Sequence, residues 1–259
     1  MNVFVFDIET IPDIASGRRL FGRDPKIMNE LSDQDVARIM FHQRQQETDG
    51  RSDFLRHHLH KIIAISVVLR SKNHFKVWSL GEQDSSEAEL LQRFFAGIEK
   101  YSPTLVSWNG NAFDLPVLHY RALLHGIPAT HYWSKNYLYR YGMQHIDLMD
   151  LLANYQPSAF ASLDQLATIL GFPGKMGMEG SQVWESYLAG HIEDIRQYCE
   201  TDVLNTYLIY LRFELMRGHL TLADYHQECR FMREKLLTEK KLHLDDFVAA
   251  IQNTTLFST

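Results

Sequence analysis

The chain has 259 residues, of which 45% are hydrophobic and 22% charged, and its formal net charge is −6. This is long enough to bury a full core in one large domain, with or without a helical elaboration. The acidic balance disfavours a protein that coats nucleic acid through a broad basic surface, but not an enzyme that grips a few nucleotides. The two cysteines exclude a disulfide framework and favour a reducing compartment. With no apolar run of membrane-spanning length and no signal-peptide pattern, we expect a cytoplasmic protein without a membrane partner.

The first predicted element is a buried strand over residues 1–6, in the stretch MNVFVFDIETIPD. Two acids, Asp7 and Glu9, follow it. Residues two apart in an extended chain point to the same face, roughly 7 Å apart, so these carboxylates repel unless positive charge lies between them. Either the strand simply runs out into solvent, or the acids form the floor of a site.

Residues 13–60 are polar and charge-rich, with at least one helix predicted around Leu31 to Met40. Residues 60–70 and 74–80 then predict a pair of strands joined by a turn at 71–73. The elements expected after them are a helix capped by Ser85 or Ser86, a strand over 104–109, a helix ended by Gly126, a last strand running into a helix capped by Asp147, a helix capped by Ser162, a glycine-rich loop over 171–181, and helices from Val183 onward. This order predicts a mixed sheet flanked by helices, with a helical carboxy-terminal third, rather than a doubly wound sheet.

Two more acids stand at positions suited to a site. Asp114 follows a predicted strand at the start of a helix, in WNGNAFDLPVL, and Asp202 lies within the longest predicted helix, in YCETDVLNTY. Tyr198 and Asp202 are four residues apart, so their side chains share one helix face.

The three segments FDIET, NGNAFD and YCETD resemble, in this order, the motifs of the DEDD superfamily of 3′–5′ exonucleases. The resemblance is closest to the proofreading exonuclease domain of family B DNA polymerases, and in particular to free-standing bacterial relatives of it. Tyrosine stands four residues before Asp202, and the position used by the histidine branch holds Gln197, so the tyrosine branch is favoured. The resemblance covers residues 1–215, with 13–60 as an insertion, and leaves 216–259 as a helical extension that we expect to pack on the same domain.

This resemblance implies an RNase H-like mixed five-stranded sheet and a two-metal hydrolysis that releases nucleoside 5′-monophosphates from the 3′ ends of single-stranded nucleic acid. It implies that two divalent cations, Mg²⁺ or Mn²⁺, are held by Asp7, Glu9, Asp114 and Asp202. Asp7 would bridge the ions, and Asp114 would reach the second ion largely through water. Such ions take oxygen ligands, and a pair about 3.5–4 Å apart can flank a phosphodiester. By the same resemblance, the tyrosine orients the attacking water, and the substrate-binding residues are Thr10, Ile11, Asn109 and Phe113.

DNA is the favoured substrate, and RNA trimming on the same fold is the alternative enzyme. A non-catalytic nucleic-acid-binding or proofreading-accessory module is the alternative of another class. It is disfavoured because such a module is expected to have lost one of the four acids, and all four are present.

For the weaker candidates we expect a structural role or simple exposure to solvent rather than a role in catalysis or binding. Asp147 is expected to be a helix cap and Asp150 a surface acid. The histidine-rich stretch 57–60 lacks the spacing of a zinc site and is expected to be a polar loop. Lys175, in the glycine-rich loop, is expected to be a solvated lysine rather than a phosphate ligand. Ile11, with Pro12, either wedges against the terminal base or packs under the insertion.

The insertion itself has a local basic character. Two interpretations stay open: it guides a phosphate backbone, or it is a solvated lid over the sheet. The residues that favour a guide are His42, Arg44, Arg51, Arg56, His57 and His58.

Overall fold

The computed structural model describes residues 2–22, 25–139 and 141–251, and the statements below concern these residues. Five strands form one sheet: β1 (Asn2–Pro12), β2 (His60–Ser71), β3 (His74–Ser79), β4 (Thr104–Ser107) and β5 (His145–Asp147). The α-helices are α1 (Ile14–Phe21), α2 (Pro25–Glu30), α3 (Asp33–Glu47), α4 (Glu87–Tyr101), α5 (Asp114–His125), α6 (Thr130–Ser134), α7 (Leu148–Leu152), α8 (Leu163–Ile169), α9 (Val183–Leu188), α10 (Ile192–Met216), α11 (Leu222–Glu239) and α12 (Leu242–Ala250). Three short 3₁₀ helices are η1 (His57–Leu59), η2 (Pro157–Ala159) and η3 (Gly180–Gln182).

The sheet is mixed, as predicted, and β1 is its central strand. The spatial order is β3-β2-β1-β4-β5; β1 and β3 pair antiparallel with β2, whereas β4 runs parallel to both β1 and β5. The carboxyl ends of β1, β4 and β5 therefore point the same way, which brings the loops that follow β4 and β5 to the same end of the sheet as the second half of β1.

The expectation that the first strand stops before the acids is wrong. β1 continues through Asp7 and Glu9 to Pro12, which pairs with His60 of β2, and the register shifts between Glu9 and Thr10. The apolar alternation continues through Ile8 and Ile11, so both faces beyond the acids are still covered by protein. The acids consequently lie in the interior of a long strand, near a β-bulge, rather than at an end in solvent.

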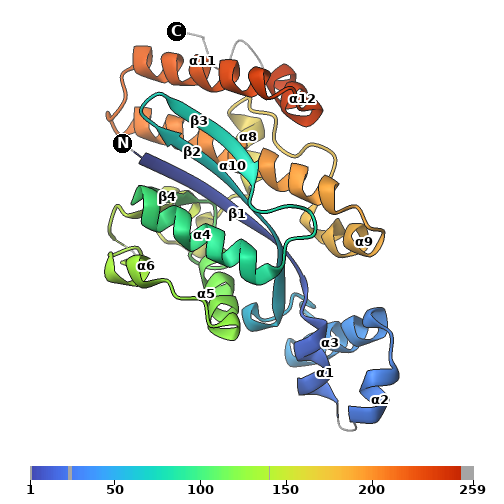
Figure 1. Ribbon diagram of the computed structural model, residues 1–259. Helices are drawn as coiled ribbons and strands as arrows, with labels where there is room; N and C mark the ends of the chain where they lie inside the picture. Colours follow the sequence, from blue (N-terminus) through green and yellow to red (C-terminus); the bar gives the residue numbers. More distant parts are fainter. Residues whose placement is uncertain (1, 23–24, 140, 252–259) are drawn as a thin grey trace.

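Helices cover both faces of the sheet (Figure 1). On one face α10 crosses β1 and β2, and α8, α11 and α12 add to the same core, which includes Val3 and Val5. On the other face α4 and α5 pack against Phe4 and Phe6; the rings of Phe6 and Phe94 are 5.2 Å apart. Because alternate residues of β1 point to opposite faces, Asp7 and Glu9 lie on the same side as Val3 and Val5, facing α10.

The carboxy-terminal helices belong to this core. α11 packs against α10 and β3, and α12 packs against α10 and α11. Their buried side chains include Tyr225, Met232 and Phe247, which share one apolar cluster with Val3 of β1. Within the described range, no helix combines the length and the apolar character needed to cross a membrane.

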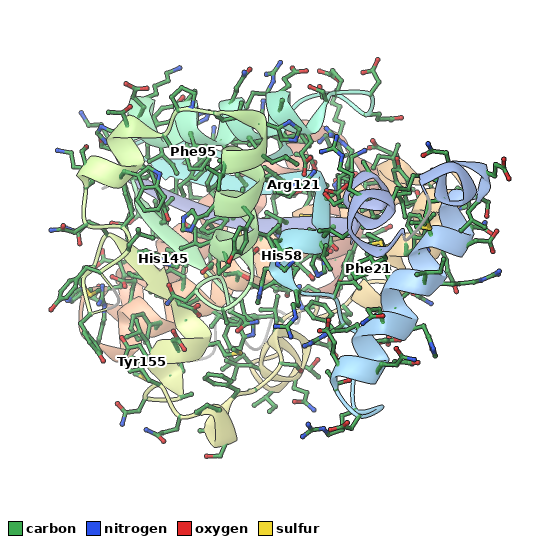
Figure 2. All side chains as sticks on the ribbon, turned by 90° about the horizontal axis from the view of Figure 1, so that it is seen from below. Phe21, His58, Phe95, Arg121, His145 and Tyr155 are labelled. Carbon is green, nitrogen blue, oxygen red and sulfur yellow. The ribbon has the colours of Figure 1, made fainter. Side chains whose placement is uncertain are left out.

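The segment between β1 and β2 forms a separate group of helices, α1 to α3, at one end of the molecule (Figures 1 and 2). The predicted helix around Leu31 to Met40 is confirmed as α3, and Met40 is buried in a small cluster of its own. The two ends of the segment stay together, because the Asp13 N–H donates to the Leu59 carbonyl at 2.8 Å. Arg121 of α5 (labelled in Figure 2) fixes the start of the segment through a 2.5 Å ion pair with Asp13.

The interpretation of residues 57–60 as a polar loop is wrong. His57–Leu59 form η1, and His60 begins β2 with only 6% of its surface exposed. The turn between β2 and β3 consists of Lys72 and Asn73.

Candidate functional site

The floor of the candidate site is the pair of acids on β1. Glu9 is buried, with 8% of its surface exposed, and Asp7 is half-buried. Both lie on the face of the sheet that α10 covers, as the spacing of two residues predicts.

Asp114 reaches this floor from the loop after β4. It is the first residue of α5, with 3% of its surface exposed, and its Oδ1 accepts a hydrogen bond from the backbone N–H of Ile8 at 3.2 Å. Since Ile8 lies between the two acids of β1, this bond fixes the third carboxylate beside the first two.

The loop that delivers Asp114 is held by a buried acid. Asp147 accepts hydrogen bonds from the backbone N–H groups of Asn109 (3.0 Å) and Asn111 (2.8 Å), and also caps α7 through the N–H of Asp150. Asn109 has a positive φ of 64°, and a Cβ at Gly110 would come within 2.3 Å of Ser107 Oγ, so the sharp turn requires glycine there. The predicted cap is confirmed, and the same carboxylate also shapes the motif that ends in Asp114.

Asp150 is not a surface acid as expected. Only 5% of its surface is exposed, and it accepts a hydrogen bond from Asn111 Nδ2 at 3.0 Å. The first turn of α7 faces the loop after β4, so this acid is enclosed by a contact between segments that are distant in sequence.

One turn of α10 completes the set of acids. Asp202 is half-buried and Tyr198 is buried, and their side chains are hydrogen-bonded to each other. Between them, Cys199 places its Sγ 3.4 Å from Asp7 Oδ2. Tyr198 packs with Ile11, which is buried at 4% exposure, so the structure gives Ile11 a packing position behind the tyrosine and little surface for a base.

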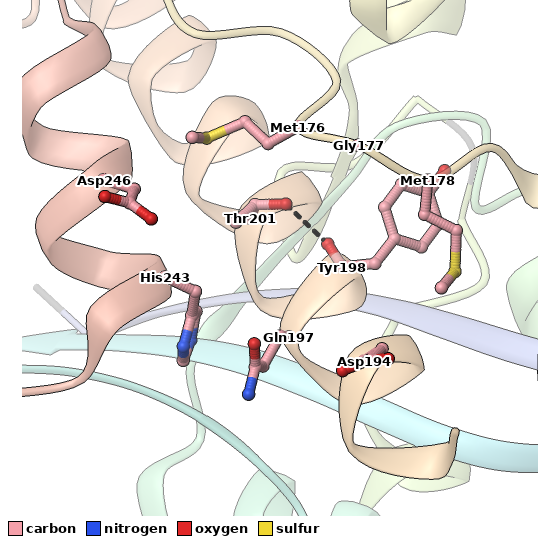
Figure 3. Close-up of a pocket in the computed structure, with 9 residues that line it drawn as sticks. All are labelled: Met176, Gly177, Met178, Asp194, Gln197, Tyr198, Thr201, His243 and Asp246. Atoms are coloured by element: carbon pink, nitrogen blue, oxygen red, sulfur yellow. Dashed lines mark hydrogen bonds between the residues drawn. The ribbon is translucent and has the colours of Figure 1, made fainter. Parts of the chain in front are cut away.

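A cavity of about 330 Å³ lies beside Tyr198, between α10, α12 and the glycine-rich loop (Figure 3). Thr201 Oγ1 donates to the backbone carbonyl of Tyr198 at 2.8 Å, and Met178 lies beside the tyrosine ring. The tyrosine is thus held by its own helix and by the loop, with one edge open to this cavity.

All four acids have a raised pKa. Burial, and then the negative charges of its neighbours, raise the pKa of Asp7 and of Glu9 well above their usual range. Burial likewise raises the pKa of Asp114 and of Asp202 to about 7. Without added positive charge, the cluster therefore holds protons at neutral pH, and its ionised form is destabilising.

These groups fit hard divalent cations. Ligand atoms of Asp7, Glu9 and Cys199 lie within 4.8 Å of one another. Burial raises the pKa of the thiol of Cys199 well above its ordinary value, so the sulfur stays protonated and donates toward Asp7. The donors that remain are carboxylate oxygens, which Mg²⁺ and Mn²⁺ prefer.

Lys175 is exposed in the glycine-rich loop, as expected of a solvated lysine, and its charge also acts on the cluster. This charge lowers the pKa of both Glu9 and Asp202, against the larger effect of burial. Its loop is fixed: Asn205 Oδ1 accepts from the Gly174 N–H at 3.2 Å, and Asn205 Nδ2 donates back to the Gly174 carbonyl at 2.8 Å. The sequence held a signal for this, because Asn205 lies three residues after Asp202 on α10 and hence faces the same way.

The other predicted substrate-binding residues lie close to the acids. Thr10 Oγ1 is 2.8 Å from Nδ1 of His60, and Phe113 is a half-buried ring directly before Asp114. The side chain of Asn109 is half-buried in the turn after β4.

The basic residues of the segment 13–60 are partly offset by acids of the same segment. Arg44 and Arg56 both contact Glu47, at 3.2 and 3.0 Å, and Arg51 lies 3.8 Å from Asp49. The guide interpretation stays a prediction. These ion pairs leave the segment 13–60 with less unpaired positive charge than its sequence suggests.

Comparisons with known proteins show which proteins this chain is similar to. A family model described as a predicted 3′–5′ exonuclease related to the exonuclease domain of PolB matches residues 52–251. A DNA polymerase of Archaeoglobus fulgidus is 27% identical over 146 residues, which are 53% of this chain and 18% of the polymerase. The chain thus spans about a fifth of that relative's length.

Among solved structures, a family B DNA polymerase from the hyperthermophilic archaeon Pyrobaculum calidifontis is similar, with a TM-score of 0.52 and 18% identity over 99% of this chain and 28% of the polymerase chain. At this identity the likeness concerns the fold, and it confirms the expected RNase H-like sheet. The match of the family model over residues 52–251 shows that the chain belongs to the family of predicted 3′–5′ exonucleases related to the exonuclease domain of PolB.

Proposed function

We propose that this protein is a metal-dependent 3′–5′ exonuclease that hydrolyses terminal phosphodiesters of single-stranded nucleic acid, with DNA favoured, and releases nucleoside 5′-monophosphates. The observation that carries the proposal is the convergence of Asp7, Glu9, Asp114 and Asp202, from three separate elements, in a setting that raises the pKa of each. A fold has no stability reason to gather four carboxylates, and perturbed acids cluster at functional sites.

These four acids would hold two divalent cations, Mg²⁺ or Mn²⁺. Bound there, the ions would supply positive charge to the phosphodiester and lower the pKa of water, which is the chemistry that the acids alone lack. The hydrogen bonds from Ile8 to Asp114 and from Cys199 to Asp7 keep the carboxylates oriented before substrate arrives.

Tyr198 is proposed to orient the attacking water. Burial and the charge of Asp202 raise the pKa of the Tyr198 hydroxyl far above its ordinary value, so it stays protonated and acts as a hydrogen-bonding group rather than a base. Lys175 is proposed to contact a phosphate oxygen of the substrate, because its charge already acts on Glu9 and Asp202 from a fixed loop.

DNA is favoured because the similar proteins are DNA polymerases. The direct test uses single strands of DNA and of RNA with equal sequence, each labelled at the 5′ end or at the 3′ end, with Mg²⁺, with Mn²⁺ or with EDTA. We expect a ladder of shortened 5′-labelled DNA and immediate loss of a 3′-terminal label as a mononucleotide. Faster degradation of RNA would favour the trimming enzyme.

An Asp114→Asn protein, which keeps the hydrogen-bond acceptor for Ile8 and removes the charge, is the matched control against a contaminating nuclease. If the wild type and this variant degrade the strands equally, or if neither degrades them with either metal, the exonuclease proposal is wrong.

A further inference from the structure

The chain just before β2 lies against the loop that carries Asp114. His57 Nε2 donates to the carbonyl of Ala112 at 2.7 Å, two residues before the acid. The rings of Phe54 and His57 both contact the ring of Phe113, with centroid distances of 5.5 and 5.8 Å. The end of the segment 13–60 therefore returns to the candidate site itself.

A second contact ties the same aromatic group to β1. The ring of His60 lies 5.1 Å from that of Phe54, and its Nε2 donates to the Leu55 carbonyl at 3.1 Å. The other ring nitrogen then accepts the hydrogen bond of the Thr10 hydroxyl, one residue after Glu9. Phe54 thus contacts Phe113 directly, and it also contacts His60, whose other ring nitrogen is bonded to Thr10.

Phe54 is also exposed and fixed in place. It has 55% of its surface accessible, while its carbonyl accepts from Arg44 Nε at 2.9 Å and its N–H donates to Ser52 Oγ at 3.1 Å. A large ring on a fixed backbone, held by tilted contacts with the rings of Phe113 and His60 and otherwise exposed, is suited to stacking because little freedom is lost when a flat partner binds.

We propose that Phe54 stacks on an unpaired base of the strand whose 3′ end lies among the four acids, so that the segment 13–60 forms one wall of the substrate site. This inference rests on the proposed exonuclease function. Every base has an aromatic face, so the contact is tolerant of sequence, but in a duplex those faces are occupied by neighbouring base pairs. The ring would thereby select single strands over duplex ends.

The test is a binding measurement that does not depend on cleavage. We would compare wild type with Phe54→Leu by fluorescence anisotropy, in Ca²⁺, using a short 5′-fluorescein DNA strand and a series in which a single abasic site moves stepwise from the 3′ end. Loss of one stacked base weakens binding by about 5- to 100-fold. We expect Phe54→Leu to bind the intact strand more weakly by a factor in that range, and to match wild type when one particular base is missing.

Trp133→Leu is the matched control, because Trp133 is an exposed ring (58%) on α6, which packs on α4 at the opposite face of the sheet from α10. It should leave affinity unchanged. Unchanged affinity in Phe54→Leu, or an equal loss at every abasic position, overturns the stacking proposal. If Phe54→Leu loses affinity in a way that depends on the abasic position, but wild type cleaves no strand with Mg²⁺ or Mn²⁺, stacking is supported and the exonuclease proposal is refuted. If wild type cleaves but Phe54→Leu keeps its affinity, the exonuclease proposal is supported and stacking is refuted. Thermal melting of both variants checks that they are folded.

Discussion

Replacing Asp114 by asparagine should make the metal-free protein more stable at alkaline pH. Asp114 is 3% exposed, and its pKa is raised to about 7 from an ordinary value near 3.8. Because the folded state binds the proton more tightly than the unfolded chain, the ionised carboxylate destabilises the fold above pH 7, and this penalty is relieved as pH falls from about 7 to about 4. At 1.36 kcal/mol per pH unit, the full penalty is about 4 kcal/mol.

Asparagine is nearly isosteric, and its Oδ1 can still accept the hydrogen bond from Ile8, so the substitution removes the charge and little else. Guanidinium unfolding in EDTA, followed by circular dichroism between pH 4 and pH 9, should show Asp114→Asn more stable than wild type by up to about 4 kcal/mol at pH 8 or above. The gap should close near pH 4. Asp35→Asn is the control: Asp35 is an exposed acid whose pKa is lowered by its hydrogen bond from Ser32, so it should show no such gain. A gap that does not change with pH, or a variant less stable than wild type at pH 8, would refute the electrostatic account of the site.

Four further outcomes follow from the same geometry. Millimolar Mg²⁺ or Mn²⁺ should raise the Tm of wild type more than that of Asp7→Asn, since ions that bind only the folded state stabilise it; equal shifts would contradict the ligand assignment. Tyr198→Phe should lower kcat more than it raises KM, because the hydroxyl is proposed to position water, and an unchanged kcat at several pH values would remove it from the mechanism. Lys175→Met should lower kcat/KM and make the fold less tolerant of high pH, since its charge opposes the raised pKa of two acids; wild-type kinetics would return it to the role of a solvated lysine. Neutralising Arg51 and Arg56 together should raise KM for oligonucleotides and flatten its salt dependence if the segment guides the backbone, and if both quantities stay at wild-type values it does not.

The parts of this structure that follow from local spacing were predictable. Two residues on a strand share a face, as do residues four apart on a helix, so the pairing of Asp7 with Glu9 and of Tyr198 with Asp202 could be derived before any fold was known. The strands, the cap at Asp147 and the mixed order of the sheet rest on equally local patterns.

What depends on distant segments meeting was missed. Asp150 becomes buried only because the loop after β4 folds over the first turn of α7, and nothing near it in the sequence indicates that contact. The loop of Lys175 is fixed near the acids by Asn205 of α10 and by Asp164, which accepts a hydrogen bond from the Lys175 N–H at 2.8 Å. The length of β1 was underestimated because two acids interrupt the apolar pattern. In the structure each residue of β1 from Asn2 to Pro12 has a pairing partner on β2, with one register shift between Glu9 and Thr10.

The two ends of the segment 13–60 are joined, and this decides which changes in its sequence the fold can accommodate. β1 and β2 are paired at Pro12 and His60, so in topology the whole excursion of α1 to α3 is the tip of a β-hairpin. The entropy of closing a loop grows only with the logarithm of its length, so the long excursion costs about 2 kcal/mol more than a short turn would. The segment 13–60 can therefore be lengthened, shortened or replaced without a change in the pairing of β1 with β2. The proposed reaction chemistry and the proposed selection of single strands would thus rest on separable parts of the chain, so that either part could vary while the other is retained.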